Sequence, residues 1–538
     1  MPKLQTNGAK QKRITYMILL LWVAVCFALL VVDWCCWAPN RLDADMASEQ
    51  LLANLLAQEG GVMSTNWYYS TELRVLNTQL VMAPLFRLFT SWHTVRVVGS
   101  VVLILLYLAA WFWFGRSAKL KYSGLLGAGL LVLPYGALYR QYVLEGLYYI
   151  PHIAISFVVL GCAVRILRGG RRLAPAAGMV LFSFAAALGG PRQLFILNIP
   201  LIVAAALLCW LDAPPADTLR QKLANAWRTP GGALLVPTLA ADAAALAGYL
   251  VNAKVLAEKY HFQDQGYVAF TGLNLDRLQW FANALLASFG WQEGKVFSLA
   301  ALFNLAAAAL ILFCFVFSVR LVRGKARYPL GHRLVGAFFL AGAVCFALLY
   351  GLTNSGHSDR YLLPLAILFV PLLEIMLADC TPRHRPDACG LTALLAAILL
   401  LRAGTDYRAA AVATNPNQGA AQFLVQNGYR DGYASFWDGN VMTELTDGTL
   451  NVWTLTPNSV PELRPWLQVT SHLQTPPQGK IFFVISKWEA YGERQPTTQA
   501  LADAMPEDAL SYEDETVKIY GFASDEAMRQ ACGFAAFP

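Results

Sequence analysis

The sequence predicts a polytopic α-helical membrane protein with a C-terminal extracytoplasmic α/β domain. Of its 538 residues, 57% are hydrophobic and 14% are charged, a balance too apolar for a water-soluble globular protein. Apolar runs long enough to cross a bilayer recur through residues 1–402, whereas residues 403–538 have shorter runs and more Asn, Asp, Gly, Thr and Pro. We therefore expect a transmembrane module over 1–402 and a separate soluble domain over 403–538.

About eleven windows have the length and hydrophobicity of membrane spans. They fall near residues 14–33, 94–114, 123–139, 149–167, 174–189, 194–211, 233–250, 296–318, 334–352, 361–378 and 388–402. The first window is too long for a signal peptide, and Trp34–Trp37 makes a poor cleavage site. We interpret it as an uncleaved first span.

Basic residues predict the orientation of these spans. Lys and Arg cluster before the first span and in every second loop after it, as cytoplasmic segments do. The N-terminus is therefore expected inside and, with an odd number of spans, the C-terminal domain outside. These clusters explain the net charge of +7 without a nucleic-acid partner. The ten cysteines show neither a disulfide framework nor a zinc-binding spacing.

The first outer loop, residues 34–92, is long and amphipathic. Its apolar spacing predicts a helix over 45–58 that Asp43 or Asp45 caps and that Gly60 and Gly61 end. Such a helix should lie along the membrane surface. A second interfacial segment is expected over 71–89, broken by Pro84.

The soluble domain shows the alternating signals of a small α/β fold. The predicted elements are a helix over 418–426, strands over 433–436, 450–455 and 481–486, and a last helix over 525–531. The segment 435–440 is interpreted as a turn that could contact an acceptor.

Three carboxylates follow the first span: Asp43, Asp45 and Glu49. One interpretation is structural, because acidic side chains cap a helix N-terminus and solvate an interfacial helix. The other is catalytic, because an aspartate at the membrane face can take a proton from a reacting hydroxyl group.

Arginines at outer turns form a second group of candidates. Arg360 and Tyr361 begin a late span, while Arg192 and Arg140 lie in short turns between spans. A guanidinium group suits phosphate oxygens, but an arginine that snorkels beside an interfacial tyrosine explains Arg360 equally well. His357 is interpreted as structural or as a minor ligand.

Taken together, the first span, the acidic motif, the many later spans and the extracytoplasmic tail resemble the GT-C superfamily of polyprenyl-phosphate-dependent glycosyltransferases. This superfamily includes protein O-mannosyltransferases and lipid A aminoarabinose transferases. The resemblance is carried by Asp43–Asp45 in the loop and Arg360–Pro364 at the late span. Many such relatives have an Asp-Glu pair in the loop, whereas Met46 follows Asp45 here.

The resemblance implies transfer of a sugar, with inversion, from a polyprenyl-phosphate donor to an extracytoplasmic lipid, glycan or protein. Asp45 is favoured as general base because it begins the helix, and Asp43 is the alternative. Further substrate contacts are expected from Glu49, Arg140, Arg192, Arg360, Tyr361 and His357. Some members of the superfamily use a divalent cation and others do not, so a cation held by Asp43, Asp45 or Glu49 stays open; no other cofactor is expected.

Two other classes stay as alternatives. An envelope polysaccharide polymerase or ligase also uses outer-loop arginines, but it usually lacks an acidic motif directly after the first span. A lipid or sugar transporter without chemistry would carry functional charges at mid-membrane. The sequence contains neither a Walker phosphate loop nor a dinucleotide-binding glycine motif.

Overall fold

The computed structural model describes residues 2–71, 73–169, 172–262, 268–355, 358–456, 462–491 and 496–533. The chain divides into two compact units, each assembled from separated stretches of sequence. The first, here called the helical unit, comprises Met1–Val32, Val102–Ala253 and Gly266–Tyr407. The second, here called the mixed unit, comprises Asp33–Val101, Lys254–Gln265 and Arg408–Pro538.

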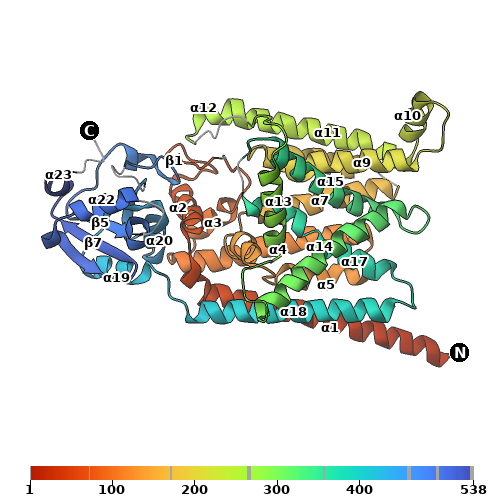
Figure 1. Cartoon of the computed structure of the whole chain (residues 1–538), viewed down its shortest axis with the longest axis horizontal. Coiled ribbons are helices and arrows are strands. Elements are labelled where there is room, and N and C mark those ends of the chain that lie inside the picture. The colour runs from red at the N-terminus through yellow and green to blue at the C-terminus, as the bar shows by residue number, and fades with distance from the viewer. Residues whose placement is uncertain are drawn as a thin grey trace. The chain divides into compact units, whose positions relative to one another are not determined.

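Long helices make up the helical unit (Figure 1). Its α-helices, three of which extend into the mixed unit, are α1 (Pro2–Cys36), α4 (Trp92–Ala118), α5 (Leu125–Leu131), α6 (Ala137–Tyr139), α7 (Ile150–Leu167), α8 (Leu173–Ala187), α9 (Ile199–Asp212), α10 (Leu219–Trp227), α11 (Pro230–Val251), α13 (Leu275–Ser288), α14 (Leu299–Arg323), α15 (Leu330–Leu352), α16 (Leu363–Ala366), α17 (Phe369–Asp379) and α18 (Arg385–Val412). Short 3-10 turns are η2 (Lys121–Gly124) and η6 (Asp359–Leu362), and π-helical turns are η3 (Arg140–Glu145), η4 (Leu194–Asn198) and η5 (Asn252–Leu256).

Within the described residues, nine helical stretches are long and apolar enough to cross a membrane, and α8 is a shorter apolar helix. The chain is thus a multi-pass membrane protein, as the sequence predicts. One expected span is wrong: residues 123–139 do not form a single helix. The chain leaves α5 at Leu131, passes Pro134 without helical structure and re-enters a helix only after Gly136. Proline lacks the N–H that would continue the helix.

The centre of the helical unit is occupied by α15, which packs against α7, α9, α14 and α17. Polar anchors fix its first turn. The ring of His332 bonds to Asp379 at 2.6 Å and to the carbonyl of Ala118 at 2.8 Å, and Arg333 donates to Asp212 at 2.9 Å. These bonds hold α15 in register with its neighbours.

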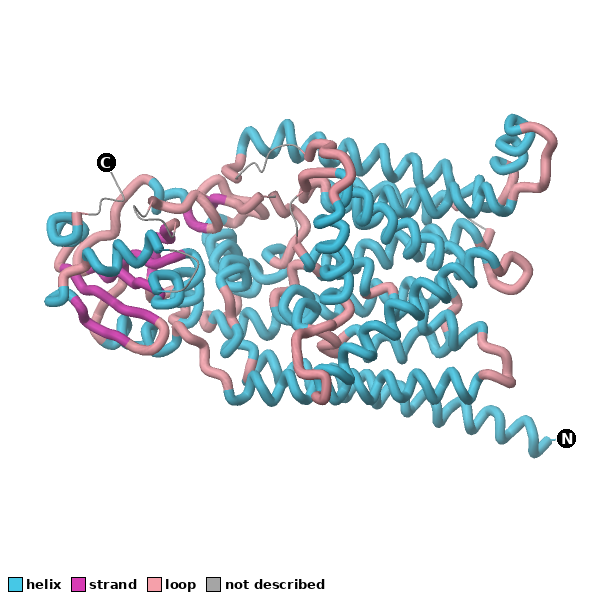
Figure 2. Tube along the Cα trace, viewed as in Figure 1, coloured by secondary structure: helices cyan, strands magenta, loops and turns pink. Residues whose placement is uncertain are grey.

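The mixed unit contains a five-stranded sheet in the order β3-β2-β5-β7-β6 (Figure 2). The first three strands in this order are parallel, and β7 and β6 are antiparallel to their neighbours. The strands are β2 (Asp431–Ser435), β3 (Asn451–Leu455), β5 (Ile481–Ser486), β6 (Leu510–Glu513) and β7 (Val517–Phe522). The helices that accompany it are α19 (Gln418–Gln426), α20 (Phe436–Leu445), α21 (Lys487–Tyr491), α22 (Pro496–Ala504) and α23 (Asp525–Cys532), with 3-10 turns η7 (Thr470–Leu473) and η8 (Glu507–Ala509).

Both faces of this sheet are buried. Phe483 on one face packs in a core that includes residues of α22 and α23, while Phe482 on the other packs with residues of α19 and α20. This arrangement explains why β5 is an unbroken apolar run, since a strand covered on both faces need not alternate with polar residues. The strands predicted over 433–436, 450–455 and 481–486 and both predicted helices of this domain are confirmed within one or two residues.

The first outer loop belongs to the mixed unit. It contains the 3-10 turn η1 (Ala38–Arg41), α2 (Ala44–Glu59), β1 (Trp67–Tyr68) and α3 (Gln79–Phe86). Strand β1 pairs antiparallel with β4 (Gln468–Val469) of the C-terminal part, and α2 packs against α20. The segment that holds α12 (Ala257–Lys259) joins the same unit, because Tyr69 donates its N–H to the carbonyl of His261 at 2.8 Å. The bounds of α2, Ala44–Glu59, confirm the helix expected over 45–58.

Candidate functional site

The acidic motif lies at the first turn of α2. Asp43 is the N-cap: its backbone is extended and its Oδ1 accepts the N–H of Met46 at 2.8 Å. Gly60 ends the helix in the left-handed conformation, with φ 81°. Asp45 is the second residue of the helix, in its first turn, and is half-buried. The sequence left Asp43 and Asp45 as candidate caps, and the structure shows that Asp43 is the N-cap of α2.

Glu49 has a different environment, although it lies on the same helix. It is buried, with 8% of its surface exposed. Its carboxylate accepts bonds from Arg74 at 3.1 Å, from Asn77 at 3.0 Å and from the hydroxyl of Thr78. These contacts hold the segment before α3 against α2, so a structural role accounts for Glu49. The contact of Glu49 with substrate that the sequence analysis expects stays a prediction.

Arg464 interacts electrostatically with Asp45. Burial lowers the pKa of its guanidinium group, while the carboxylates of Asp45 and Glu489 act in the opposite direction. The guanidinium carbon also lies 4.9 Å from the ring centre of Phe436. Arg464 therefore interacts both with an acid of the first outer loop and with an acid of the C-terminal part.

Two buried acids extend this cluster. Asp438, at the start of α20, accepts the hydroxyl of Ser435 at 2.9 Å, and burial raises the pKa of its carboxyl group. Burial raises the pKa of Glu489 to about 7, with the Asp438 carboxylate acting in the same direction and Ser435 and Arg464 acting against it. Near neutral pH, Glu489 can thus hold or release a proton.

Sequence reasoning missed Arg464 and Glu489 and placed Asp438 only in an expected turn. That turn is wrong, because residues 436–445 form the helix α20. The helix tolerates Gly439 because a Cβ there would lie 2.9 Å from Val452 on β3, so the small residue allows close packing. A usable signal was an acid beside aromatic residues, which is present both at Asp438, after Phe436 and Trp437, and at Glu489, after Trp488.

The predicted arginines come together in the helical unit. Arg192 donates to the hydroxyl of Tyr149 at 3.2 Å and lies 4.8 Å from the ring centre of Tyr361. Arg360 lies 5.1 Å from the ring centre of Tyr142, and the rings of Tyr142 and Tyr149 are 6.1 Å apart. Two guanidinium groups from distant segments thus share one set of tyrosines, here called the arginine–tyrosine cluster, which suits an anionic group.

Arg140 has other partners. It lies 3.4 Å from Glu145 and 3.3 Å from Asp406, so two carboxylates already balance its charge. A role in substrate binding stays a prediction for this residue. His357 lies outside the described residues.

A divalent cation does not fit the acidic motif. In the described ranges, no group of three or more His, Cys, Asp or Glu side chains is arranged to hold a metal ion. Of the three acids, Asp43 caps α2 and Glu49 bonds to Arg74, Asn77 and Thr78.

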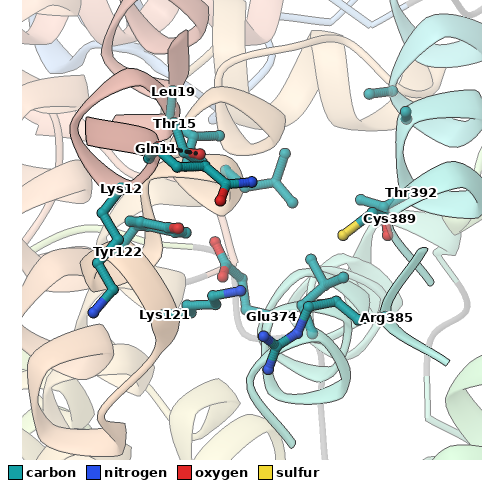
Figure 3. Close-up of a pocket in the computed structure, with 14 residues that line it drawn as sticks. Gln11, Lys12, Thr15, Leu19, Lys121, Tyr122, Glu374, Arg385, Cys389 and Thr392 are labelled. Atoms are coloured by element: carbon teal, nitrogen blue, oxygen red, sulfur yellow. Dashed lines mark hydrogen bonds between the residues drawn. The ribbon is translucent and has the colours of Figure 1, made fainter. Parts of the chain in front are cut away.

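A large cavity lies in the helical unit between α1, η2, α17 and α18, with a volume of about 570 Å³ (Figure 3). Lys12, Lys121 and Arg385 line it together with Glu374 and several apolar side chains. Glu374 is buried and accepts the N–H of Gly127 at 2.7 Å. A mostly apolar wall with basic groups suits the head group of a membrane lipid. None of the site residues expected from the sequence lines this cavity.

These features define a polytopic membrane protein with the GT-C fold, as expected from the sequence. The chain superimposes on ArnT from Cupriavidus metallidurans in the apo state with a TM-score of 0.56 and 13% identity, over 93% of this chain and 97% of that chain. ArnT bound to undecaprenyl phosphate gives a TM-score of 0.54 at 13% identity and the same coverage. The oligosaccharyltransferase of Archaeoglobus fulgidus in complex with zinc and sulfate gives 0.48 at 12% identity, over 89% of this chain and 70% of that chain. No protein-family model and no curated protein matches the sequence.

Proposed function

We propose that the protein is a membrane glycosyltransferase that moves a sugar from a polyprenyl-phosphate donor to an acceptor outside the membrane. The observation that carries this proposal is the arginine–tyrosine cluster, in a chain that shares its fold with ArnT, which was solved with undecaprenyl phosphate. Both arginines lie beside apolar helices, where an amphiphilic donor would place its phosphate.

Arg192 and Arg360 would bind the phosphate of the donor. Each guanidinium group offers several N–H donors in one plane, which matches phosphate oxygens better than an ammonium group does. The tyrosine rings orient the guanidinium groups through cation–π contacts. As the bond to the sugar breaks, these charges would stabilise the negative charge that develops on the leaving phosphate.

Asp45 would be the general base. The acceptor hydroxyl attacks the anomeric carbon, the bond between that carbon and the phosphate oxygen breaks, and the hydroxyl proton passes to the aspartate. Polyprenyl phosphate leaves with the bonding electrons, and a single displacement inverts the anomeric centre. Asp45 is preferred to Asp43 because the carboxylate of Asp43 already accepts the N–H of Met46. We further propose, from the distribution of basic residues, that the N-terminus is cytoplasmic and that α2 faces the outside.

The alternatives differ in donor and product. A polysaccharide polymerase or ligase would use a diphosphate-linked oligosaccharide, and a transporter would move its substrate without changing a covalent bond. The charges in the arginine–tyrosine cluster lie at the ends of helices, at Arg192 before η4 and Arg360 in η6, which favours a reaction at the membrane face.

The test is transfer of radiolabelled sugar from polyprenyl-phosphate donors to an envelope extract by the purified protein. We expect transfer by the wild type and its loss in Asp45→Asn. Asp217→Asn, in an exposed loop, is the matched control and should keep full activity. Full activity of a folded Asp45→Asn protein would overturn the base assignment, and absence of transfer from every monophosphate donor would overturn the class.

A further inference from the structure

A second cavity lies wholly within the mixed unit and has a volume of about 210 Å³. One wall is a single face of α2. Leu51, Asn54, Leu55 and Gln58 line it, and they are spaced three and four residues apart, so that they project from the same side of the helix. The opposite wall comes from α20, β3, β4 and η7. The acidic motif is at the first turn of the same helix.

The lining of this cavity is uncharged and combines polar with apolar side chains. It combines two indole rings, those of Trp67 and Trp92, with several carboxamides and one hydroxyl group. The carboxamides and the hydroxyl belong to Asn54, Gln58, Asn440, Asn451, Gln468 and Thr443. No Asp, Glu, Lys or Arg is among the lining residues. Such a wall offers phosphate none of the cationic partners that give its strongest bonds, but it matches a ligand with many neutral hydroxyl groups.

His472 adds a hydrogen-bond acceptor, because its ring is neutral and its tautomer is set by a neighbouring residue. Burial lowers the pKa of its imidazole to about 3, so the ring is neutral at physiological pH. Its Nε2 lies 3.0 Å from Oδ1 of Asn451, which can only accept, so Nε2 carries the proton. Nδ1 is then an acceptor. The ring stacks on Trp453 at 4.0 Å between centres, which fixes its orientation.

Two buried polar atoms of this lining have unused hydrogen-bonding capacity. Trp67 is 1% exposed and His472 is 7% exposed. In the part of the chain that the structure describes, neither Nε1 of Trp67 nor Nδ1 of His472 has a hydrogen-bond partner. Buried polar groups are normally satisfied, and leaving one unsatisfied destabilises the protein. Both side chains line the cavity, and a hydroxyl group can accept from an indole N–H or donate to an imidazole nitrogen.

Gly448 helps to keep the cavity open, because it leaves room for the indole ring of Trp92. Gly448 adopts a φ of 75°, and a Cβ there would lie 2.8 Å from Cζ2 of Trp92. Any side chain at residue 448 would therefore push the indole of Trp92, which lines the cavity, out of position. A glycine satisfies both the left-handed turn and the position of this ring.

We propose that this cavity binds a neutral sugar ring and is the subsite for a carbohydrate part of the acceptor. Indole faces, the carboxamides of Asn54 and Gln58 on the α2 side, and an unpaired donor and acceptor match a pyranose, which has apolar C–H faces and a rim of hydroxyl groups. Its assignment to the acceptor rests on the glycosyltransferase function proposed above. The absence of charge in the lining separates this subsite from the donor phosphate.

The test measures sugar binding directly, without turnover. Full-length protein in lipid nanodiscs, free of maltoside and glucoside detergents that would compete, is titrated with methyl glucopyranoside, methyl mannopyranoside and methyl galactopyranoside by saturation-transfer NMR. We expect at least one of these neutral glycosides to bind. Glucose 1-phosphate should bind at least tenfold more weakly than the best of them.

Two variants locate the binding. Trp67→Phe keeps an aromatic ring and removes one N–H, so we expect binding about fivefold weaker, the value of one hydrogen bond. Asn54→Phe fills the cavity from the face of α2 and should abolish binding. Trp227→Phe, at an exposed tryptophan of α10, is the matched control and should bind as the wild type does.

Several outcomes would overturn the proposal. These are no binding of any glycoside, binding that neither variant weakens, tighter binding of glucose 1-phosphate, or binding of an unglycosylated Asn-Ser-Thr peptide in place of the sugars. Failure of the proposed function looks different. In that case no sugar is transferred from any donor, while glycoside binding and its dependence on Trp67 persist.

Discussion

Arg96 in α4 and Glu444 in α20 form a buried ion pair with two parallel hydrogen bonds, each 2.6 Å long. Both residues are 7% exposed. The same guanidinium group also donates to the carbonyl of Met46 at 2.9 Å. One arginine therefore connects three segments of the mixed unit and fixes the backbone one residue after Asp45.

The first prediction concerns this pair. Glu444→Gln should lower the free energy of unfolding by about 3–5 kcal/mol, because it leaves the charge of Arg96 buried and uncompensated. Thermal unfolding of the purified protein would measure the loss. Glu526→Gln, at an exposed position of α23, is the control and should change the stability by less than about 0.5 kcal/mol. Equal stability of the two variants would show that the pair does not hold these segments together.

The second prediction separates capping from catalysis in the acidic motif. Asparagine caps a helix nearly as well as aspartate, whereas alanine loses the bond at a cost of about 1 kcal/mol. Asp43→Asn should therefore keep both stability and transfer activity, and Asp43→Ala should lower stability. Asp45→Asn should lose activity with stability unchanged. Loss of transfer in a stable Asp43→Asn protein would instead identify Asp43 as the base.

The third prediction tests the arginine–tyrosine cluster. Arg192→Lys keeps the charge but cannot both donate to Tyr149 and stack on Tyr361 with a planar group. We expect the KM for the polyprenyl-phosphate donor to rise about tenfold, the equivalent of about 1.4 kcal/mol, with a smaller change in kcat. Arg228→Lys, at an exposed position after α10, should leave both unchanged. A change confined to kcat would argue against a role in donor binding.

The fourth prediction is a dependence of stability on pH. The pKa of Glu489 is raised from 4.5 to about 7 in the folded protein, so the folded state binds the proton more tightly than the unfolded state. Stability should therefore fall as pH rises from about 4.5 to about 7 and then level off. Glu489→Gln should flatten this fall, leaving a residual slope from Asp438, whose pKa is also raised.

Thermal unfolding from pH 5 to pH 8 would test this dependence. The midpoints of the wild type should decline more steeply than those of Glu489→Gln. Glu515→Gln, at an exposed position, should follow the wild type. Parallel curves for all three proteins would contradict the assignment.

Local signals in the sequence predicted local structure well. The spacing of apolar residues and the glycine at residue 60 predicted α2, and the apolar run 481–486 predicted β5. The failures came where a tertiary contact decides. The segment 435–440 was interpreted as a turn, but it begins the helix α20, in which the missing side chain of Gly439 allows close packing against Val452. Pro134 ended a helix inside a window that hydrophobicity alone interprets as one span.

The candidate site was predicted in part for the same reason. Charges that stand out in an apolar context, such as Arg192 and Arg360, could be found from the sequence, and the structure brings these two onto one set of tyrosines. Arg464 and Glu489 belong to no pattern that marks a site in the sequence. Only the fold places Arg464 beside Asp45, so no local pattern could have indicated it.

The pairing of β1 with β4 has a consequence for how the protein is made. Strand β1 is synthesised early, but its partner follows only after nearly all of the helices of the helical unit. During synthesis the first outer loop therefore lacks two of its partners, because β4 and the helix α20, against which α2 packs, are made later. Truncation within the C-terminal part should thus remove the contacts that hold β1 and α2 in place. A deletion near the C-terminus would then disturb the acidic motif near the N-terminus.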